Sequence, residues 1–286
     1  MTNLKQIAEG VWYQPADRTY DQPCLYAVVG ERKTLMVDGG VTPALAGVFA
    51  GELRALTGRG VDYVALTHWH WDHTFGLAGV DAPVIACANT ARHINKMASY
   101  ESWSDEALDE RVHSGEEIPF CAEYIKKTYP GQTRNNIVIR KPDLVFDGSM
   151  TLDLGGLTCE LSLLPKVHTD DCVAIHVPQC RLLFVGDCTG QNSYEQPAHY
   201  AAPAVLELFR RIEAIKARLI MESHGEPANS QEFFSDNRIL IDAANGVLAG
   251  KHDKVGLLKH MKAQNADVLP EDAEEVVELF LNGIGR

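Results

Sequence analysis

The sequence has no surplus of positive charge, no paired cysteine motif and no long apolar run. Its formal net charge is -13 over 286 residues, which argues against a nucleic-acid partner because such a partner attracts a basic surface. The seven cysteines include no C-x-x-C pair, and their number is odd, so no disulfide framework is predicted. No stretch approaches the apolar length that spans a bilayer.

These absences favour a particular class of protein. The opening segment "MTNLKQIAEGVWYQ" lacks the basic and apolar parts of an export signal. We therefore expect a soluble, cytoplasmic protein with reduced thiols, a small-molecule substrate and no membrane or nucleic-acid partner; whether it forms a homo-oligomer stays open. The hydrophobic fraction of 45% is enough for the core of one large domain spanning residues 1–286.

The first third of the chain alternates predicted strands with a predicted helix. Two apolar runs between residues 24 and 40 are typical of a hairpin. A helix is predicted to start at Thr42 and to stop at Gly58, followed by a strand at residues 61–67. The helix is expected to bury one apolar face made of Leu45, Val48, Phe49, Leu53 and Leu56.

The remaining chain divides into three parts. Residues 89–140 are polar, helical and rich in aromatics, which favours either a lid over a site or a surface insertion with its own small core. From residue 144 strand patterns return, with turns typical of an antiparallel meander, and residues 230–286 are mainly helical. The simplest fold is α/β, with two β layers flanked by helices.

The segment "THWHWDHTFG", residues 67–76, places three histidines and an aspartate in six consecutive positions directly after a predicted strand. Neutral imidazoles and carboxylates at this density suit zinc, iron or manganese. A solvated histidine-rich loop, or core histidines satisfied by hydrogen bonds, is the alternative. The position at a strand end favours a metal site made by His68, His70, Asp72 and His73.

Further candidate ligands follow three later apolar strands. They are His168 in "LLPKVHTDD", Asp187 in "LLFVGDCTG" and His224 in "LIMESHGEP". Layered α/β proteins usually build their sites at the carboxyl ends of strands, so we expect these three side chains to meet the histidine cluster. Cys188, next to Asp187, is predicted to point away from the site.

This ordered set of residues resembles the metallo-β-lactamase superfamily of metal-dependent hydrolases. The resemblance runs from about Asp38 in "MVDGG", through "HWHWDH" at 68–73, to His224. It implies a four-layer αββα sandwich with the metals at one edge.

The resemblance also implies a role for each residue. His68, His70 and His168 would hold one divalent ion, and Asp72, His73 and His224 a second, with Asp187 between them. Asp38 resembles the buried aspartate that orients the histidine loop; a turn aspartate at the Gly39-Gly40 bend is a compatible alternative. Zinc is the expected metal, with manganese and iron as alternatives.

Two such ions activate a water molecule, so the expected activity is hydrolysis by a metal-bridging hydroxide. An ester, lactone or related small carbonyl compound is the expected substrate, and a phosphodiester or thioester is the alternative. Asp187 argues against a true β-lactamase, because the antibiotic-hydrolysing members usually carry cysteine or serine there. Asp72 is expected to transfer a proton.

Tyr194 and His199 follow Asp187 closely and are candidate oxyanion donors, although either could be an ordinary loop residue. Two other classes stay open. One is an iron-dependent persulfide dioxygenase, and the other is a metal-binding protein without catalysis, which the large number of ligands disfavours because structural zinc sites are generally closed tetrahedra.

Overall fold

The computed structural model describes residues 3–266 and 268–286, and its strands form two sheets. The first sheet has seven strands in chain order, of which the first four pair antiparallel and the later pairs are parallel. They are β1 (Lys5–Ala8), β2 (Val11–Gln14), β3 (Leu25–Val29), β4 (Thr34–Val37), β5 (Tyr63–Ala65), β6 (Val84–Cys87) and β7 (Leu144–Phe146).

The second sheet has six strands in the order β13-β12-β11-β10-β9-β8. All neighbours pair antiparallel except β11 and β12, which are parallel. The strands are β8 (Ser149–Gly155), β9 (Leu157–Leu163), β10 (Val173–Val177), β11 (Leu182–Gly186), β12 (Leu219–Glu222) and β13 (Ala228–Asn229). The expected meander is therefore present from β8 to β11, whereas "LVFDG" contributes β7 to the first sheet.

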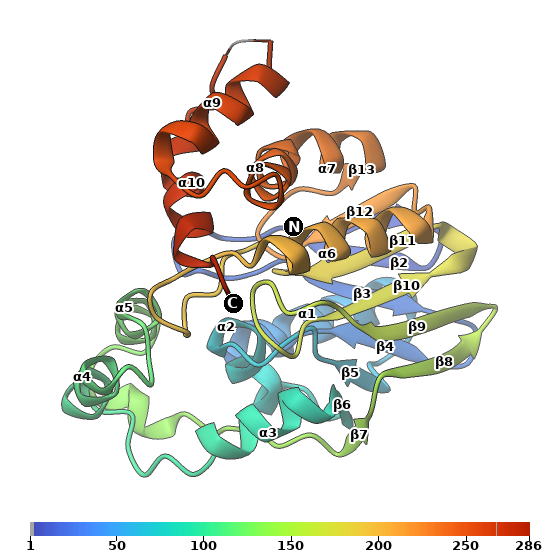
Figure 1. The fold of residues 1–286 in the computed structure, drawn as a ribbon. Coiled ribbons are helices and arrows are strands. Elements are labelled where there is room, and N and C mark those ends of the chain that lie inside the picture. The colour runs from blue at the N-terminus through green and yellow to red at the C-terminus, as the bar shows by residue number, and fades with distance from the viewer. Residues whose placement is uncertain (1–2, 267) are drawn as a thin grey trace.

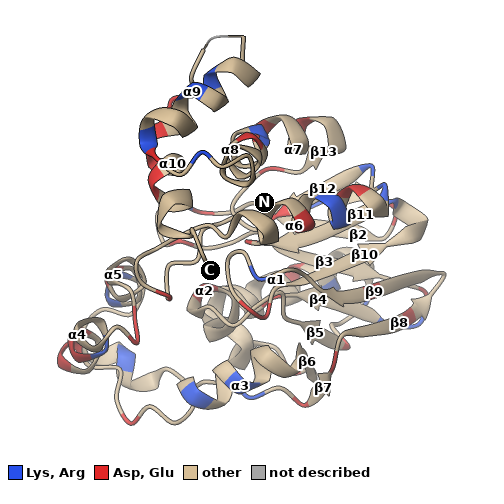
Figure 2. Cartoon of the chain, viewed as in Figure 1, with Lys and Arg blue, Asp and Glu red and all other residues tan. Residues whose placement is uncertain are grey.

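Helices cover the outer faces of both sheets (Figure 1). Those before residue 140 are α1 (Pro43–Thr57), α2 (Trp71–Thr74), η1 (Phe75–Gly79), α3 (Ala88–Met97), α4 (Asp105–Ser114), α5 (Pro119–Thr128) and η2 (Gly131–Asn136). Those after it are η3 (Pro178–Cys180), α6 (Ala202–Ile215), α7 (Ser230–Asp236), α8 (Arg238–Leu248), α9 (Lys254–Gln264) and α10 (Ala273–Asn282). Figure 2 shows acidic and basic residues mainly on these helices and at turns, while most of the strands are uncharged.

Three buried clusters correspond to the three interfaces between four layers. The middle cluster joins the facing sides of the sheets and contains side chains such as Val28, Val37, Ile175 and Phe184. One outer cluster packs α1, η1 and the segment 89–140 on the first sheet, and the other packs α6, α8, α9 and α10 on the second. This is the predicted αββα sandwich.

Helix α1 begins and ends where the sequence predicts, but it buries a different face. The Thr42 side chain accepts a hydrogen bond from the Leu45 backbone, and Gly58 ends the helix in the left-handed conformation. Phe49 and Leu53 are buried as expected, whereas Val48 is 55% exposed. Leu56 is also exposed and the small Ala46 is buried, because positions 46, 49 and 53 share a face of a helix with 3.6 residues per turn.

The segment 89–140 packs on the first sheet's helical layer rather than around a core of its own. Trp103 is buried, and its ring meets that of Phe75 edge to face at 4.9 Å. The Tyr129 hydroxyl donates a hydrogen bond to the Val41 carbonyl. Both contacts tie the segment to the part of the chain that follows β4 and β5. Among residues 3–266 and 268–286, no helix has the length and apolar content needed to span a bilayer.

Candidate metal centre

The histidine loop begins where β5 ends and is fastened to the turn that follows β4. Asp38 is buried in this turn with φ of 61°, a left-handed conformation that aspartate tolerates better than most residues. Its carboxylate accepts hydrogen bonds from the Thr67 backbone at 2.7 Å, the Thr67 hydroxyl at 2.8 Å and His73 Nδ1 at 2.9 Å. Asp38 is therefore bonded to both ends of the histidine loop, at Thr67 before His68 and at His73.

A close backbone approach fixes the other side of the loop. The Gly76 N–H donates to the Gly40 carbonyl, and the Gly39 N–H donates to the His73 carbonyl. A Cβ at Gly76 would lie 2.0 Å from the Gly39 oxygen, so a side chain there would push the two segments apart. The backbone that carries the histidines is therefore held in place by hydrogen bonds at Asp38 and at Gly76.

The predicted ligands converge in two groups. His68, His70 and His168 form the first group, and Asp72, His73, Asp187 and His224 form the second; within each group one donor atom per residue lies within 4.8 Å of all the others. We call these the histidine group and the mixed group. The residues come from the loop after β5, the loop before β10 and the ends of β11 and β12.

Within the histidine group, nitrogen atoms face one another. His70 Nδ1 lies 3.0 Å from His68 Nε2 and 3.1 Å from His168 Nε2. The other nitrogen of His68 contacts the Thr67 hydroxyl, which already donates to Asp38, and the other nitrogen of His168 donates to the Gln191 carbonyl. These outer contacts place the protons of His68 and His168 on Nδ1, so that lone pairs point inward.

Within the mixed group, carboxylate oxygens lie among imidazole nitrogens. Asp72 Oδ2 is 3.0 Å from His73 Nε2 and 3.2 Å from His224 Nε2. Asp187 Oδ2 is 3.3 Å from His73 Nε2 and 3.4 Å from His224 Nε2. The same Asp187 oxygen is 3.8 Å from His68 Nε2, which places it between the two groups.

These spacings fit a metal ion in each group. Tetrahedral ligands about 2.0–2.1 Å from zinc are roughly 3.3 Å from one another, close to the separations of 3.0–3.4 Å that several pairs show here. Inward-facing lone pairs repel one another unless a cation lies between them. The donors of the histidine group therefore suit a divalent cation better than an internal hydrogen-bond network, and the two carboxylates of the mixed group attract a cation by their negative charge.

The two groups differ in their protonation. Burial lowers the pKa of His68, His70 and His168, and the neighbouring histidines of the cluster lower it further. Burial also opposes the charge on His73 and His224, but the carboxylates beside them raise the pKa of both well above the usual value. In turn, His224 and His73 hold the pKa of Asp187 low in spite of burial. The mixed group therefore attracts positive charge more strongly.

Asp72, the predicted proton carrier, belongs to the mixed group and is buried. Burial alone would raise the pKa of its carboxyl, but His73 and His224 hold it below its usual value. Its carboxylate faces the same space as Asp187 and His224, and all three line one cavity of about 380 Å³. Asp72 can therefore bind an ion and also reach a molecule in the cavity.

Tyr194 lines the same cavity, and its ring lies 5.0 Å from that of His70. Its hydroxyl donates a 2.6 Å hydrogen bond to Glu117 Oε1, a buried carboxylate from the connection between α4 and α5 whose pKa is raised by burial. The hydroxyl proton is thus directed to Glu117 rather than to the ligands. The sequence analysis missed this partner, because nothing near Glu117 in sequence signals a site.

His199 is buried in the loop after Asp187, and its Nδ1 lies 3.1 Å from the Pro197 carbonyl and 3.2 Å from the Glu195 carbonyl. Its backbone pairs with that of Asn192 in both directions. These contacts join His199 to other residues of its own loop and not to the metal-binding groups. The geometry gives the predicted catalytic role of His199 no support, since His199 is not among the residues that line the cavity.

The sequence analysis also missed Asp21, which lines the cavity beside the mixed group. Its Oδ1 lies 4.0 Å from His224 Nδ1, and burial together with the charge of Asp72 raises its pKa to about 7. Only the fold brings residues 21 and 224 together.

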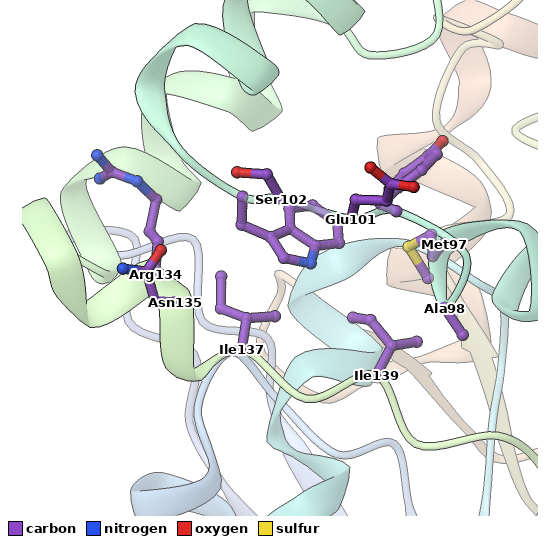
Figure 3. A pocket seen from close by; sticks show the side chains of 10 residues that line it. Met97, Ala98, Glu101, Ser102, Arg134, Asn135, Ile137 and Ile139 are labelled. Carbon is purple, nitrogen blue, oxygen red and sulfur yellow. The ribbon is translucent and has the colours of Figure 1, made fainter.

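One wall of the cavity comes from the segment 89–140, which contributes Ile118, Phe120 and Cys121. Another cavity of about 270 Å³ lies within that segment, between the end of α3 and residues 134–139 (Figure 3). Its lining includes Trp103 and Ile137 but no histidine. The candidate site is therefore the cavity that contains the two ligand groups.

Comparisons with known proteins agree with this geometry. The sequence profile of the Metallo-beta-lactamase superfamily matches residues 20–224. No curated protein sequence gives a significant match.

Similar solved structures include a metallo-beta-lactamase from Pontibacter korlensis, with a TM-score of 0.58 and 18% identity over 83% of this chain and 97% of that one. A motif mutant of a metallo-beta-lactamase from Cronobacter sakazakii has a TM-score of 0.55 and 19% identity, covering 93% and 95% of the two chains. The inverting sec-alkylsulfatase Pisa1 from Pseudomonas sp. has a TM-score of 0.63 and 14% identity; the match covers 96% of this chain and 46% of the sulfatase. At these identities the likeness concerns the fold.

Proposed function

Since the chain belongs to the metallo-β-lactamase superfamily, we propose that it is a two-metal hydrolase of uncharged carboxylic esters or lactones with an apolar portion. The observation that carries the proposal is the cavity itself. Members of both ligand groups line it together with apolar side chains such as Ile118 and Phe120, and none of its described lining residues is Lys or Arg.

The donor sets support two divalent ions. His68, His70 and His168 would hold one ion, and Asp72, His73 and His224 the other, with Asp187 shared between them. Imidazole and carboxylate together suit zinc first, and also manganese or iron. Ions held in this way would supply an acidified water molecule and would polarise the bond under attack.

The charge of the cavity supports an uncharged substrate. Its lining contains Asp21, Asp72 and Asp187 and no lysine or arginine among the described residues. The two divalent ions would offset the charges of Asp72 and Asp187. An anionic group away from the ions would still meet Asp21 without a guanidinium or ammonium partner. A neutral carbonyl compound avoids that repulsion, and its apolar part can lie against Ile118 and Phe120.

Asp187 supports the same conclusion. The resemblance of the sequence places this carboxylate where antibiotic-hydrolysing members carry cysteine or serine. We propose that Asp187 serves a hydrolase other than a β-lactamase. Asp72 would accept and return the proton of the reaction, and Tyr194, held by Glu117, would form a fixed side of the cavity. The segment 89–140 would act as a cover over the bound molecule.

A panel of chromogenic substrates on zinc-, manganese- and iron-loaded protein tests the proposal. We expect neutral nitrophenyl esters and aromatic lactones to be hydrolysed. An ester of the same length that ends in a carboxylate is the matched control, and we expect its kcat/KM to be at least about tenfold lower, since every 1.4 kcal/mol of lost transition-state binding is tenfold.

The panel also includes a cephalosporin, a phosphodiester, a thioester and a secondary alkyl sulfate. Faster turnover of any of these than of every neutral ester would contradict the proposal and name the substrate class instead. Oxygen uptake with a persulfide by the iron-loaded protein, without ester hydrolysis, would assign the chain to redox chemistry.

A further inference from the structure

The outer nitrogen atoms of the ligand histidines show a regular pattern. His68 Nδ1 contacts the Thr67 hydroxyl at 3.1 Å, His73 Nδ1 contacts Asp38 at 2.9 Å, and His168 Nδ1 contacts the Gln191 carbonyl at 3.0 Å. A histidine that binds a metal almost always donates its second N–H to such an acceptor, which fixes the ring and its tautomer. His70 departs from the pattern, since its Nε2 is buried without a partner.

His224 is the ligand histidine with the weakest support. Its side chain is 31% exposed, whereas those of His68 and His73 are fully buried. Its ring meets that of His73 edge to face at a centroid distance of 6.0 Å. Packing therefore does little to orient this ring, and an acceptor at Nδ1 would have a large effect on it.

Asp21 lies where that acceptor is needed. Its Oδ1 is 4.0 Å from His224 Nδ1, which is too long for a hydrogen bond but within reach of a small rotation of either side chain. The backbone of Asp21 has φ of 56°, a conformation in which aspartate is enriched. The carboxylate thus stands beside the ring on the side opposite to Asp72, which faces Nε2.

The contact between the two sheets fixes this placement. The Cys24 N–H donates to the Ser223 carbonyl at 2.6 Å, and Cys24 Sγ donates to the Gly225 carbonyl at 3.3 Å. The residues on both sides of His224 are thereby bonded to the segment that follows Asp21.

The turn that carries Asp21 is itself held at both ends. The backbones of Asp17 and Gln22 pair in both directions, and the Gln22 side chain accepts from the Val41 N–H. Asp21 is therefore held in position beside His224.

We propose that Asp21 is the positioning residue for His224: its carboxylate accepts the Nδ1–H of His224 when the mixed group binds its metal ion. The inference rests on the proposed metal site. Asp21 would act on His224 as Asp38 acts on His73, and it would strengthen the second ion's binding without touching the ion.

The test measures metal affinity without substrate, by competition of zinc between the protein and a chromogenic chelator. Removal of an outer partner typically weakens metal binding 10- to 100-fold. We expect Asp21→Ala to weaken binding of the mixed group's ion by about that factor and to leave the histidine group's ion unchanged. Asp21→Asn, which keeps an oxygen acceptor, should restore most of the affinity.

Cobalt-substituted protein gives an independent readout. The exchangeable Nδ1 proton of a cobalt-bound histidine is visible in the shifted NMR spectrum, and the His224 signal is assigned by its loss in His224→Gln. We expect that signal to move in Asp21→Asn and to broaden by exchange with water in Asp21→Ala. Asp17→Asn, which removes a charge from the same turn, is the matched control and should change neither readout.

Several results would overturn the inference. Equal losses in Asp21→Asn and Asp21→Ala would make Asp21 a direct ligand, because an amide replaces a carboxylate ligand poorly. Unchanged metal affinity in Asp21→Ala would overturn it while leaving the proposed function intact, and a rise of KM alone would indicate contact with the substrate. Failure of the unmodified protein to bind two ions would overturn both proposals.

Discussion

The histidine group is built from three imidazoles, whereas the mixed group combines two carboxylates with two imidazoles. The first has pKa values lowered by burial, so its nitrogens are neutral and ready to bind a metal. The second has histidine pKa values raised by its carboxylates, so protons compete with the metal there. The comparison teaches that two neighbouring sites with overlapping ligand types can respond in opposite ways to pH and to mutation.

Asp187 links the two groups, and its replacement should have the largest effect. In Asp187→Ala we expect loss of the mixed group's ion and a fall in kcat/KM of more than about 100-fold, because a lost ligand should exceed the cost of a lost outer partner. Metal content by elemental analysis and kinetics with the best ester check this. Asp170→Ala, near His168 but paired with Arg92, should keep both ions. Full metal content and full activity in Asp187→Ala would show that Asp187 is not a ligand shared by the two groups.

Asp38 supports the histidine loop through Thr67 and His73, so its replacement should affect the mixed group more than the histidine group. Asp38→Asn tolerates the left-handed backbone but cannot accept all three hydrogen bonds. We expect a loss of about 1–3 kcal/mol in the free energy of unfolding and 10- to 100-fold weaker binding of one ion. Urea unfolding and chelator competition measure the two effects. Equal weakening of both ions would show that Asp38 shapes the whole loop.

In the metal-free protein, the contribution of the five ligand histidines to stability should be largest near pH 6.5, the ordinary histidine pKa. The raised pKa values of His73 and His224 give stability that is fully present below that pH and is lost as the pH rises through the raised values. The lowered values of His68, His70 and His168 cost stability as the pH falls below 6.5. Asp21 and Asp171, whose pKa burial raises to about 7, remove stability as the pH rises toward that value. Thermal unfolding between pH 5 and 9, with zinc-loaded protein as the control, tests this. If the stability did not fall as the pH rises above 7, where the raised values of His73 and His224 act, the expected sign for the mixed group would be wrong.

The same difference predicts proton release. Binding of an ion to the mixed group near neutral pH should displace protons from His73 and His224, roughly one to two in all, whereas the histidine group should release few. Calorimetric titration with zinc in buffers of different ionisation enthalpy measures the protons released at each step. Equal release at both steps would show that the two groups do not differ in protonation.

Tyr194→Phe should have the smallest effect on the metal groups. The change leaves Glu117 without its hydroxyl donor, which should cost about 1–3 kcal/mol of stability, while both ions stay bound. Tyr129→Phe, which loses a hydrogen bond outside the cavity, is the matched control for turnover. A fall in kcat of more than about 100-fold without a change in KM would restore the oxyanion role of Tyr194.

Much of the site could be predicted from local sequence patterns. His68 to His73 follow an apolar strand, and His168, Asp187 and His224 each follow another. Strand ends meet at one edge of a sheet, so ligand-type residues at several strand ends predict a shared site. The helix at Pro43–Thr57 was predictable because its cap and stop residues act locally.

Other features depended on contacts between distant segments. The strand Leu144–Phe146 has the same local pattern as its successors, yet it pairs with Val84–Cys87 in the first sheet. Tyr194 was predicted as an oxyanion donor, and only the structure shows that Glu117, far away in sequence, accepts a hydrogen bond from its hydroxyl. Sequence spacing carries no information about such partners.

By itself the sequence determined which side chains can bind metal, and that they lie at strand ends, because apolar periodicity and residue type are local properties. The tertiary structure decided how those side chains divide into a histidine group and a mixed group. It also decided which carboxylates lie beside them: Asp38 beside His73 and Asp21 beside His224. The physical reason is that protonation, lone-pair direction and ion spacing depend on distances of a few ångströms, which arise only when the two sheets pack together.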